Sequence, residues 1–304
     1  MSEHVIVGAG AVGSATALLL AERGEHVRII TRRGGGPEHP AIERIAADAT
    51  DAERLTELTA GAAALYNCAS PQYHQWFTDW PPLEKSFLTA AEHTGAVLVS
   101  MSNLYGYGPV DGPIGQKTPI AATHPKLLLR ARMWDDQQAA QHQGRIRTTE
   151  VRASDYIEAN GLLSFGLGKP ILAGKRAYSP APLDVPHSWT SVHDCARTLV
   201  TVATDDRAYG QVWMVPTNPA LTVRQLASRF AEANGVRPAR VTVIPYPVMW
   251  ATGLFMPMVK ELRTTRYQFT RPFVIDASAT TEMFGLQPVA MDEALRDAAA
   301  RLRA

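Results

Sequence analysis

The stretch that decides the fold is VIVGAGAVG, residues 5–13. An apolar run, a glycine-rich turn and the start of a helix follow one another here, in the order that the GxGxxG pattern of dinucleotide-binding proteins requires. In that pattern Gly8 permits the tight turn and Gly10 lets the backbone approach a pyrophosphate. Gly13 allows the helix to pack closely on the strand.

The helix expected after this turn opens with Ala11 and Val12. The first N–H groups of a helix have no intrahelical partner, and the helix dipole is positive at that end, so both favour a bound phosphate. The segment therefore predicts a dinucleotide site at the start of the chain. A glycine turn with a purely structural role is the alternative.

The rest of the first half alternates short apolar runs with longer amphipathic stretches. Strands are expected at 4–8, 26–31, 42–47, 63–68, 96–102 and 146–152, and helices at 11–23, around 54–58, at 83–94 and from 125 to about 143. Strands that alternate with helices form βαβ units. The pattern predicts an α/β fold with a Rossmann-type, doubly wound parallel sheet.

After Asp155 this alternation breaks down, and prolines interrupt the sequence before helices resume at 191–203, 222–233 and 292–302. We expect residues 1–155 to form the nucleotide-binding domain, with a returning segment near 185–205. Residues 156–304 would form mainly a smaller, discontinuous C-terminal substrate-binding region. The apolar stretch 248–259 is too short to span a bilayer. It indicates a buried or substrate-covering helix, with a membrane-surface role as the alternative.

Composition excludes several classes of protein. The 304 residues include 30 Lys+Arg and 29 Asp+Glu, a balance that argues against a nucleic-acid partner. The two cysteines, Cys68 and Cys195, cannot build a disulfide framework, and no metal-ligand spacing such as HExxH occurs. With neither a signal peptide nor a spanning apolar run, we expect a cytoplasmic protein with no membrane partner and no metal.

The end of the second expected strand indicates which dinucleotide is bound. A site that prefers NAD usually places Asp or Glu here to accept hydrogen bonds from the ribose 2′-OH. This chain has Arg32 and Arg33 instead, and a guanidinium matches a 2′-phosphate in charge and geometry. We therefore predict NADP, with Arg32 as the stronger contact and NAD as the alternative cofactor. Two solvated arginines in a loop would give the same sequence.

Further segments are similar to those of one family, in the same order. They are ADATD at 47–51, NCAS at 67–70, YGP at 107–109, RASD at 152–155, WTSVHD at 189–194, FVID at 273–276 and FGLQP at 284–288. Over nearly its full length the chain resembles the NAD-dependent epimerase/dehydratase family, the extended short-chain dehydrogenases. The resemblance implies that Asp48 and Ala49 hold the adenine. It also implies that Cys68, Ala69 and Ser70 lie along the cofactor.

The resemblance fails in the catalytic segment. The family uses a Ser or Thr at the end of the fifth strand and a Tyr-x-x-x-Lys pair on the next helix, where the tyrosine exchanges a proton while hydride moves. Laid without gaps on residues 118–130, the family pattern places Lys126 at the tyrosine and Arg130 at the lysine. When the family's Tyr-Gly pair is aligned on residues 107–108, Asn103 falls at the serine position with Ser102 beside it. When the pair is aligned on residues 105–106, Met101 falls at that position instead.

Three interpretations of this segment remain. Lys126 would act as the acid if burial and the nearby cation Arg130 bring the pKa of its ammonium toward neutrality, so that it gives up its proton readily. Tyr105 or Tyr107 would donate the proton from the loop. In the third interpretation no group donates, and the site binds nucleotide without redox chemistry. For Lys126 and Arg130 the structural alternative is an exposed helix face.

The candidate catalytic residues are therefore Ser102, Tyr107, Lys126 and Arg130. The candidate substrate contacts are Asn103, Tyr105, His187 and Trp189.

The leading functional hypothesis is an atypical short-chain dehydrogenase that transfers hydride between NADP(H) and a small organic substrate. The alternatives are a nucleotide-sugar epimerase or dehydratase and a non-catalytic NADP(H)-binding redox sensor. The helix after Pro125 carries more apolar residues than one core-facing stripe needs. A homodimer through this helix is an alternative to burial in the monomer.

Overall fold

The structure is a computed structural model that describes residues 2–238 and 240–303. The chain forms two compact units. The first unit contains the residues up to Gly106, Pro125–Arg152 and Cys195–Val215, and the second contains Tyr107–His124, Ala153–Asp194 and Pro216 onward.

This division differs from the expected one in two segments. The loop 107–124 joins the second unit, where Ile114 pairs with Ile275. The returning segment runs over 195–215 rather than 185–205, because it ends in a strand that joins the sheet of the first unit.

The first unit is built on a seven-stranded parallel sheet in the order β10-β6-β5-β4-β1-β2-β3. The strands are β1 (Glu3–Val7), β2 (His26–Thr31), β3 (Ile42–Ala46), β4 (Ala64–Asn67), β5 (Val97–Asn103), β6 (Thr148–Ala153) and β10 (Val212–Met214). The predicted Rossmann-type α/β fold is confirmed. The six expected strands lie within two residues of their predicted ends, whereas the three-residue β10 was not predicted.

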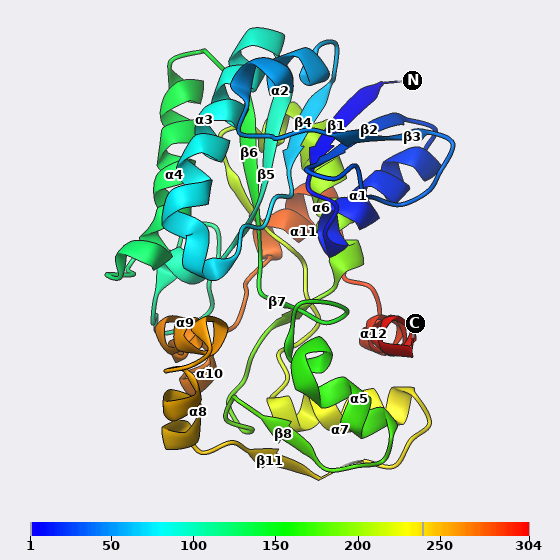
Figure 1. Cartoon of the computed structure of the whole chain (residues 1–304), viewed down its shortest axis with the longest axis vertical. Helices are drawn as coiled ribbons and strands as arrows, with labels where there is room; N and C mark the ends of the chain where they lie inside the picture. Colours follow the sequence, from blue (N-terminus) through cyan, green and yellow to red (C-terminus); the bar gives the residue numbers. More distant parts are fainter. Residues whose placement is uncertain (1, 239, 304) are drawn as a thin grey trace. The chain divides into compact units, whose positions relative to one another are not determined.

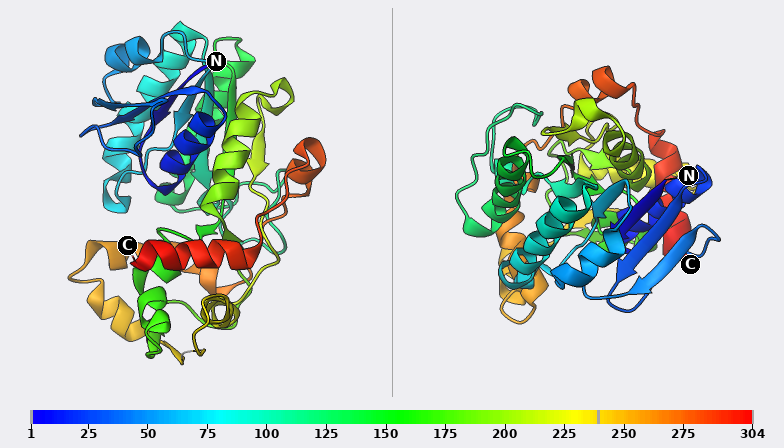
Figure 2. Two further views of the ribbon diagram at one scale, coloured as in Figure 1. Left: turned by 90° about the vertical axis from the view of Figure 1, so that its right-hand side faces the viewer. Right: turned by 90° about the horizontal axis from the view of Figure 1, so that it is seen from above.

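Helices cover both faces of this sheet. They are α1 (Ala11–Glu22), α2 (Ala52–Thr59), α3 (Trp76–Thr94), α4 (Pro125–His142) and α6 (Val192–Ala203). Figures 1 and 2 show α2, α3 and α4 on one face and α1 and α6 on the other. Leu55, Phe87 and Met133 from the first group pack on Val5 and Leu98 of the strands. This burial on both faces explains why the strands are apolar throughout.

Helix α3 begins seven residues before the predicted start. The predicted start at Leu83 comes directly after Pro81 and Pro82, and proline normally disrupts a helix interior at a cost of about 3 kcal/mol or more. The structure holds both prolines inside α3. Trp76 and Trp80 are buried in the first turns, and burial of two such large side chains offsets the lost backbone hydrogen bonds.

The second unit is a smaller assembly of helices and short strands. Its helices are α5 (Gly168–Leu172), α7 (Val223–Ala233), α8 (Tyr246–Thr252), α9 (Pro257–Thr265), α10 (Tyr267–Thr270), α11 (Ser278–Phe284) and α12 (Met291–Arg303). Two strand pairs, β7 (Asp155–Tyr156) with β9 (Trp189–Thr190) and β8 (Ala177–Ser179) with β11 (Val241–Val243), complete it. Its core packs α5, α7 and α12 together (Figure 2).

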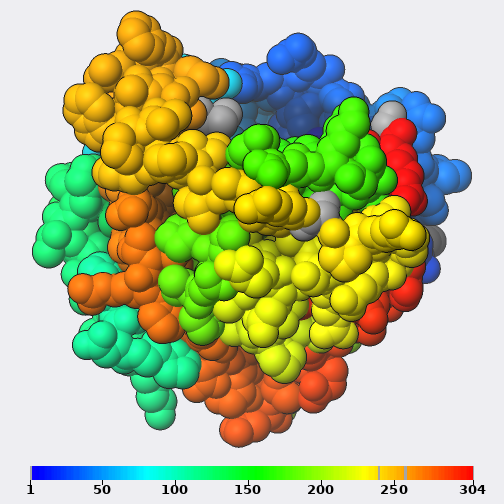
Figure 3. Space-filling model, turned by 90° about the horizontal axis from the view of Figure 1, so that it is seen from below, coloured from blue at the N-terminus to red at the C-terminus, as the bar shows by residue number. Residues whose placement is uncertain are grey.

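The apolar stretch 248–259 does not form the expected buried helix. Helix α8 ends before Gly253, and α9 starts at Pro257. Val248, Trp250 and Leu254 are exposed, and Phe255 is 86% exposed. Figure 3 shows the part of this segment before Pro257 in gold on the surface of the molecule. No helix among the described residues combines the length and apolarity that crossing a membrane requires.

Candidate functional site

The glycine turn after β1 is fixed by close backbone packing. Gly8 has a φ of +102°, and a Cβ built there would lie 2.5 Å from the carbonyl oxygen of Cys68. A Cβ on Gly13 would overlap the carbonyl oxygen of Gly8 and approach the Cβ of Cys68 to 3.1 Å. Both positions therefore need glycine for the fold itself.

Gly10 differs from these two because no protein atom requires it to be glycine. Its φ of −69° is open to any residue, and a Cβ built there meets nothing within 4 Å. Gly10 caps α1 without a side-chain hydrogen bond, and the first turn of α1 contains no acidic residue. The helix end is thus left open beside empty space, as phosphate binding requires.

Sheet topology places this turn where ligands bind in α/β proteins. Residue Val7 at the end of β1 pairs with Ile30 on one side and Asn67 on the other. The chain turns from β1 outward to β2 and β3, and later returns on the opposite side of β1 to form β4. The strand order therefore reverses between β1 and β4, and such a switch point is the usual ligand crevice.

Polar groups follow β2 and β3 along the same edge. Arg32 and Arg33 are exposed just beyond β2. The Oδ1 of Asp48 accepts hydrogen bonds from the Thr50 amide at 3.0 Å and from its hydroxyl at 2.8 Å. These hydrogen bonds, with a smaller contribution from the Arg32 charge, lower the pKa of the Asp48 carboxyl. Ala49 is buried beside it.

The segment after β4 passes directly under the glycine turn. Cys68 is buried, and burial raises the pKa of its thiol to about 12, so it stays protonated and unreactive at neutral pH. The Ala69 amide donates to the Oδ1 of Asn67 at 3.3 Å, and Ser70 is exposed. The contribution of Cys68 to the turn is therefore structural, because its backbone packs closely against Gly8.

Strand β5 ends in the predicted Ser102 and Asn103. Ser102 is buried, and the Oδ1 of Asn103 accepts the amide of Tyr105 at 2.9 Å. Tyr105 belongs to the first unit and is half-buried, whereas Tyr107 is buried and belongs to the second. The structure thus divides the two candidate tyrosines between the units.

The two cations of α4 are buried, which contradicts the alternative of an exposed helix face. Lys126 is 7% exposed and Arg130 is 4% exposed. The Nη2 of Arg130 donates to the carbonyl oxygen of Met101 at 2.7 Å, and its guanidinium lies 4.0 Å from the centre of the Trp80 ring. Arg130 therefore anchors the end of β5, immediately before Ser102.

A buried carboxyl lies near this arginine and was not predicted from the sequence. The Oε1 of Glu84 accepts the Gln137 amide at 2.9 Å, and Gln137 in turn accepts the hydroxyl of Thr148 at 3.0 Å. Burial raises the pKa of Glu84 to about 7, against the opposing effects of the Gln137 hydrogen bond and the Arg130 charge. Glu84 is therefore partly protonated at neutral pH.

An aromatic group beside β4 and β5 was also missed. Tyr73 and Trp76 stack with ring centroids 4.7 Å apart, and Trp76 stacks on Tyr105 at 6.0 Å. Phe77 is exposed, and the Nζ of Lys126 lies 5.9 Å from its ring centroid. The sequence did contain the signal. One helix face is indicated by the aromatic residues at positions 73, 76, 77 and 80. They lie before Pro81 and Pro82, however, and the predicted helix began only after these prolines.

His187 and Trp189 lie in the second unit and are fully buried. The Nε2 of His187 lies 2.8 Å from the Oδ2 of Asp155, and its Nδ1 lies 3.2 Å from the Gln268 carbonyl oxygen. The indole N–H of Trp189 donates to the Leu221 carbonyl oxygen at 2.9 Å. Packing within the unit therefore accounts for both residues, and their assignment as substrate contacts stays a prediction.

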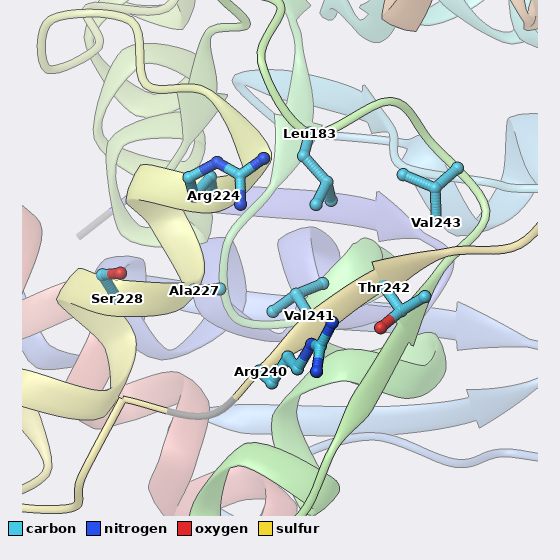
Figure 4. Close-up of a pocket in the computed structure, with 8 residues that line it drawn as sticks. All are labelled: Leu183, Arg224, Ala227, Ser228, Arg240, Val241, Thr242 and Val243. Carbon is cyan, nitrogen blue, oxygen red and sulfur yellow. The ribbon is translucent and has the colours of Figure 1, made fainter.

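A surface cavity of about 540 Å³ lies elsewhere in the second unit, between α7 and β11 (Figure 4). It is lined by Leu183, Arg224, Ala227, Ser228, Arg240, Val241, Thr242 and Val243. None of the predicted site residues lines it, and Asp184 already holds the Arg224 guanidinium through two hydrogen bonds of 2.7 and 2.9 Å. Within the described part of the chain, no group of three or more His, Cys, Asp or Glu residues is arranged to hold a metal.

Comparison with known proteins identifies the fold. No family model and no curated protein matches the sequence. Solved structures do match over the whole chain. UDP-glucose 4-epimerase from Thermotoga maritima, solved with UDP-glucose, is 14% identical over 99% of this chain and 98% of its own, with a TM-score of 0.79. The chain has the fold of nucleotide-sugar epimerases.

Two further structures support this. The UDP-glucose 4-epimerase of Stenotrophomonas maltophila, with bound NAD and formylated UDP-arabinopyranose, is 16% identical over 100% of this chain and 98% of its own, with a TM-score of 0.80. The UDP-N-acetylglucosamine 4-epimerase of Bacillus cereus is 12% identical over the full length of both chains, with a TM-score of 0.79. The resemblance to the epimerase/dehydratase family is thus confirmed at the level of the fold.

Proposed function

We propose that this protein is an enzyme that binds a nicotinamide dinucleotide at the glycine turn of its first unit. It would move a hydride between that cofactor and an oxygen-bearing carbon of a small organic substrate. The observation that carries the proposal is the open space at Gly10, beside the uncapped N-terminus of α1. The fold requires glycine at positions 8 and 13 but not at position 10, and phosphate binding would explain the glycine at position 10.

The residues around the turn fit such a cofactor. The amides of Ala11, Val12 and Gly13 would hold the pyrophosphate, and Asp48 with Ala49 would border the adenine. When bound, the nicotinamide supplies a hydride acceptor or donor. Arg32 and Arg33 favour NADP, because their exposed guanidinium groups follow β2 where a 2′-phosphate would lie. Several solved structures that share this fold contain NAD, and a direct test separates the two cofactors.

Substitution of Arg32 is that test. Arg32→Ala should weaken NADPH binding by about tenfold or more and leave NADH binding nearly unchanged, because a charge-assisted contact to the 2′-phosphate is lost. Isothermal titration with both cofactors measures this. Arg145→Ala, an exposed arginine paired with Glu92 at the far end of α4, is the control. Equal losses for NADPH and NADH in Arg32→Ala would contradict the 2′-phosphate assignment.

Proton transfer is assigned to Lys126. Its ammonium replaces the phenol of the usual tyrosine, and the structure buries it on the first turn of α4. Arg130 acts as a positioning residue, because its guanidinium holds the Met101 carbonyl oxygen before Ser102. Tyr107 is the alternative donor. Turnover should fall about 100-fold or more in Lys126→Ala if Lys126 donates the proton, and in Tyr107→Phe if the tyrosine does.

The comparisons favour one class of reaction among those that share this hydride step. Epimerases of nucleotide sugars have this fold, so transient oxidation of a nucleotide sugar is a second, more specific candidate beside net reduction of a carbonyl compound. Net reduction of a carbonyl oxidises NADPH and lowers its absorbance. Epimerisation leaves that absorbance unchanged and inverts the configuration of one carbon of the sugar. Tight cofactor binding without turnover of either class would instead indicate a redox sensor.

A homodimer through α4 is also proposed. Of the apolar residues that suggested it, Leu127, Met133 and Trp134 are buried within the chain, whereas Leu128 and Leu129 are only half-buried. The apolar surface left for a partner is therefore smaller than the sequence indicated. Light scattering of the purified protein should give twice the chain mass of 33.1 kDa if the dimer forms.

A further inference from the structure

Four aromatic side chains of the first unit are here called the aromatic shelf: Tyr73, Trp76 and Tyr105, whose rings lie against one another, and Phe77, which follows Trp76 on α3. Trp76 is its buried base, stacked on Tyr73 at an interplanar angle of 18° and on Tyr105 at 25°. Tyr73 is 37% exposed and Phe77 is 52% exposed. Aromatic side chains grouped at the surface in this way are typical of ligand-binding and interaction sites.

The shelf lies at the edge of the sheet where a substrate would meet the cofactor. Tyr73 comes three residues after Ser70, in the segment expected along the cofactor, and Tyr105 comes two residues after Asn103, at the end of β5. Both therefore follow the carboxyl ends of neighbouring strands, where ligands bind in parallel α/β sheets.

The polar atoms of the shelf are used within the protein. The hydroxyl groups of Tyr73 and Tyr105 hydrogen-bond to each other, and the Trp76 indole N–H donates to the Pro71 carbonyl oxygen at 3.1 Å. The indole N–H and one of the two hydroxyl hydrogens are therefore used within the protein, and ring faces make up the larger part of what the shelf offers a ligand. A planar aromatic ring stacks on such faces over a larger area than a puckered sugar ring does, so this surface suits an aromatic ring better.

A cation lies at the border of the shelf. The Nζ of Lys126 is 5.9 Å from the centroid of the Phe77 ring, and α3 and α4, which carry these two residues, pack against each other. A ring lying on the shelf would place a substituent oxygen toward Lys126. An ammonium favours a carbonyl or carboxylate oxygen at that point.

We infer that the aromatic shelf binds the substrate of this enzyme through a planar aromatic ring that carries a carbonyl or carboxylate oxygen directed at Lys126. The reaction part of this inference rests on the proposed function. The binding part does not, because a ring stacks on the shelf whether or not hydride moves.

Binding of 2-naphthoate tests the inference without any turnover. Isothermal titration, with and without NADP⁺, should show binding of 2-naphthoate and at least about tenfold weaker binding of decahydro-2-naphthoate, which has the same carbon skeleton but no π face. Phe77→Leu should weaken 2-naphthoate binding about five- to tenfold, since the exposed ring is replaced by an apolar side chain.

Phe165→Leu is the matched control, because Phe165 is an exposed aromatic residue of the second unit, and this variant should bind 2-naphthoate as the wild type does. Equal binding of the saturated and aromatic acids would overturn the inference. So would an equal loss in Phe165→Leu and Phe77→Leu, or binding of UDP-glucose without binding of 2-naphthoate. The NADP⁺ titration reports on the cofactor site separately, so failure of the shelf and failure of the proposed function give different results.

Discussion

At the scale of single residues, the three glycines of the first turn carry two different requirements. A side chain on Gly8 would clash with the backbone of Cys68, and one on Gly13 would clash with the backbone of Gly8. A side chain on Gly10 would meet no protein atom within 4 Å. The sequence pattern grouped all three under nucleotide binding. Only the structure separates Gly8 and Gly13, which the fold requires, from Gly10, which we propose is kept for the ligand.

This separation predicts opposite outcomes for two similar variants. Gly10→Val should unfold at the same urea concentration as the wild type but lose at least about tenfold in NADPH affinity, since its side chain would fill the phosphate space. Gly13→Val should lose stability by about 1–3 kcal/mol or more, because its side chain overlaps backbone. Denaturation and titration of both variants measure this. Unaltered NADPH binding in Gly10→Val would show that the nucleotide does not lie at this turn.

Glu84 gives a prediction about pH. Its folded-state pKa of about 7 lies above the ordinary value of 4.5, so the folded state binds more protons than the unfolded state between these values. Stability should therefore fall as the pH rises from about 4.5 to 7, and the loss should persist above that range. The loss is on the order of 3 kcal/mol. Glu84→Gln should remove this part of the pH dependence and be more stable than the wild type at pH 8.

Urea denaturation at pH 5 and pH 8 checks the expectation for Glu84. Glu92→Gln, on the exposed part of the same helix and paired with Arg145, is the control and should keep the wild-type slope. A Glu84→Gln protein that retains the full wild-type pH dependence would show that Glu84 is ionised in the same way in both states.

At the scale of elements, the sequence predicted the regular part of the chain and failed where tertiary contacts decide. The alternation of apolar strands and amphipathic helices located β1 to β6, and Thr222 with Gln225 forms the capping box that starts α7. The early start of α3 could not be predicted, because it depends on whether the burial of Trp76 and Trp80 outweighs the helix-breaking effect of the two prolines. The exposure of α8 could not be predicted either, because an apolar stretch normally indicates a buried helix.

The exposure of the α8–α9 segment predicts that its apolar residues add little to stability. Phe255→Ser should change the free energy of unfolding by no more than about 0.5 kcal/mol, as is usual at exposed positions. Phe230→Ala in α7, which is fully buried in the core of the second unit, should cost about 3–5 kcal/mol. Urea unfolding of both variants compares them. A large loss in Phe255→Ser would mean that this segment is packed in solution.

At the scale of the whole molecule, the fold and the backbone geometry of the glycine turn could be predicted from the sequence, while the catalytic group could not. GxGxxG has a fixed geometric meaning, so its context in a βαβ pattern sufficed. Lys126 and Arg130 at the positions where the resemblance expects Tyr and Lys left the chemistry open. The structure narrows it, since it buries both cations, binds Arg130 to the end of β5, and leaves Lys126 beside the exposed ring of Phe77.

Hydride transfer itself is the most direct test of the central claim. NADPH deuterated at C4 is incubated with the protein and a panel of aromatic aldehydes, ketones and a UDP-4-ketohexose, and the products are analysed by mass spectrometry. The account predicts deuterium on the former carbonyl carbon of at least one product with the wild type, and its loss in Lys126→Ala but not in Lys85→Ala, an exposed lysine of α3. NADPH that binds tightly but transfers no deuterium to any compound would contradict it.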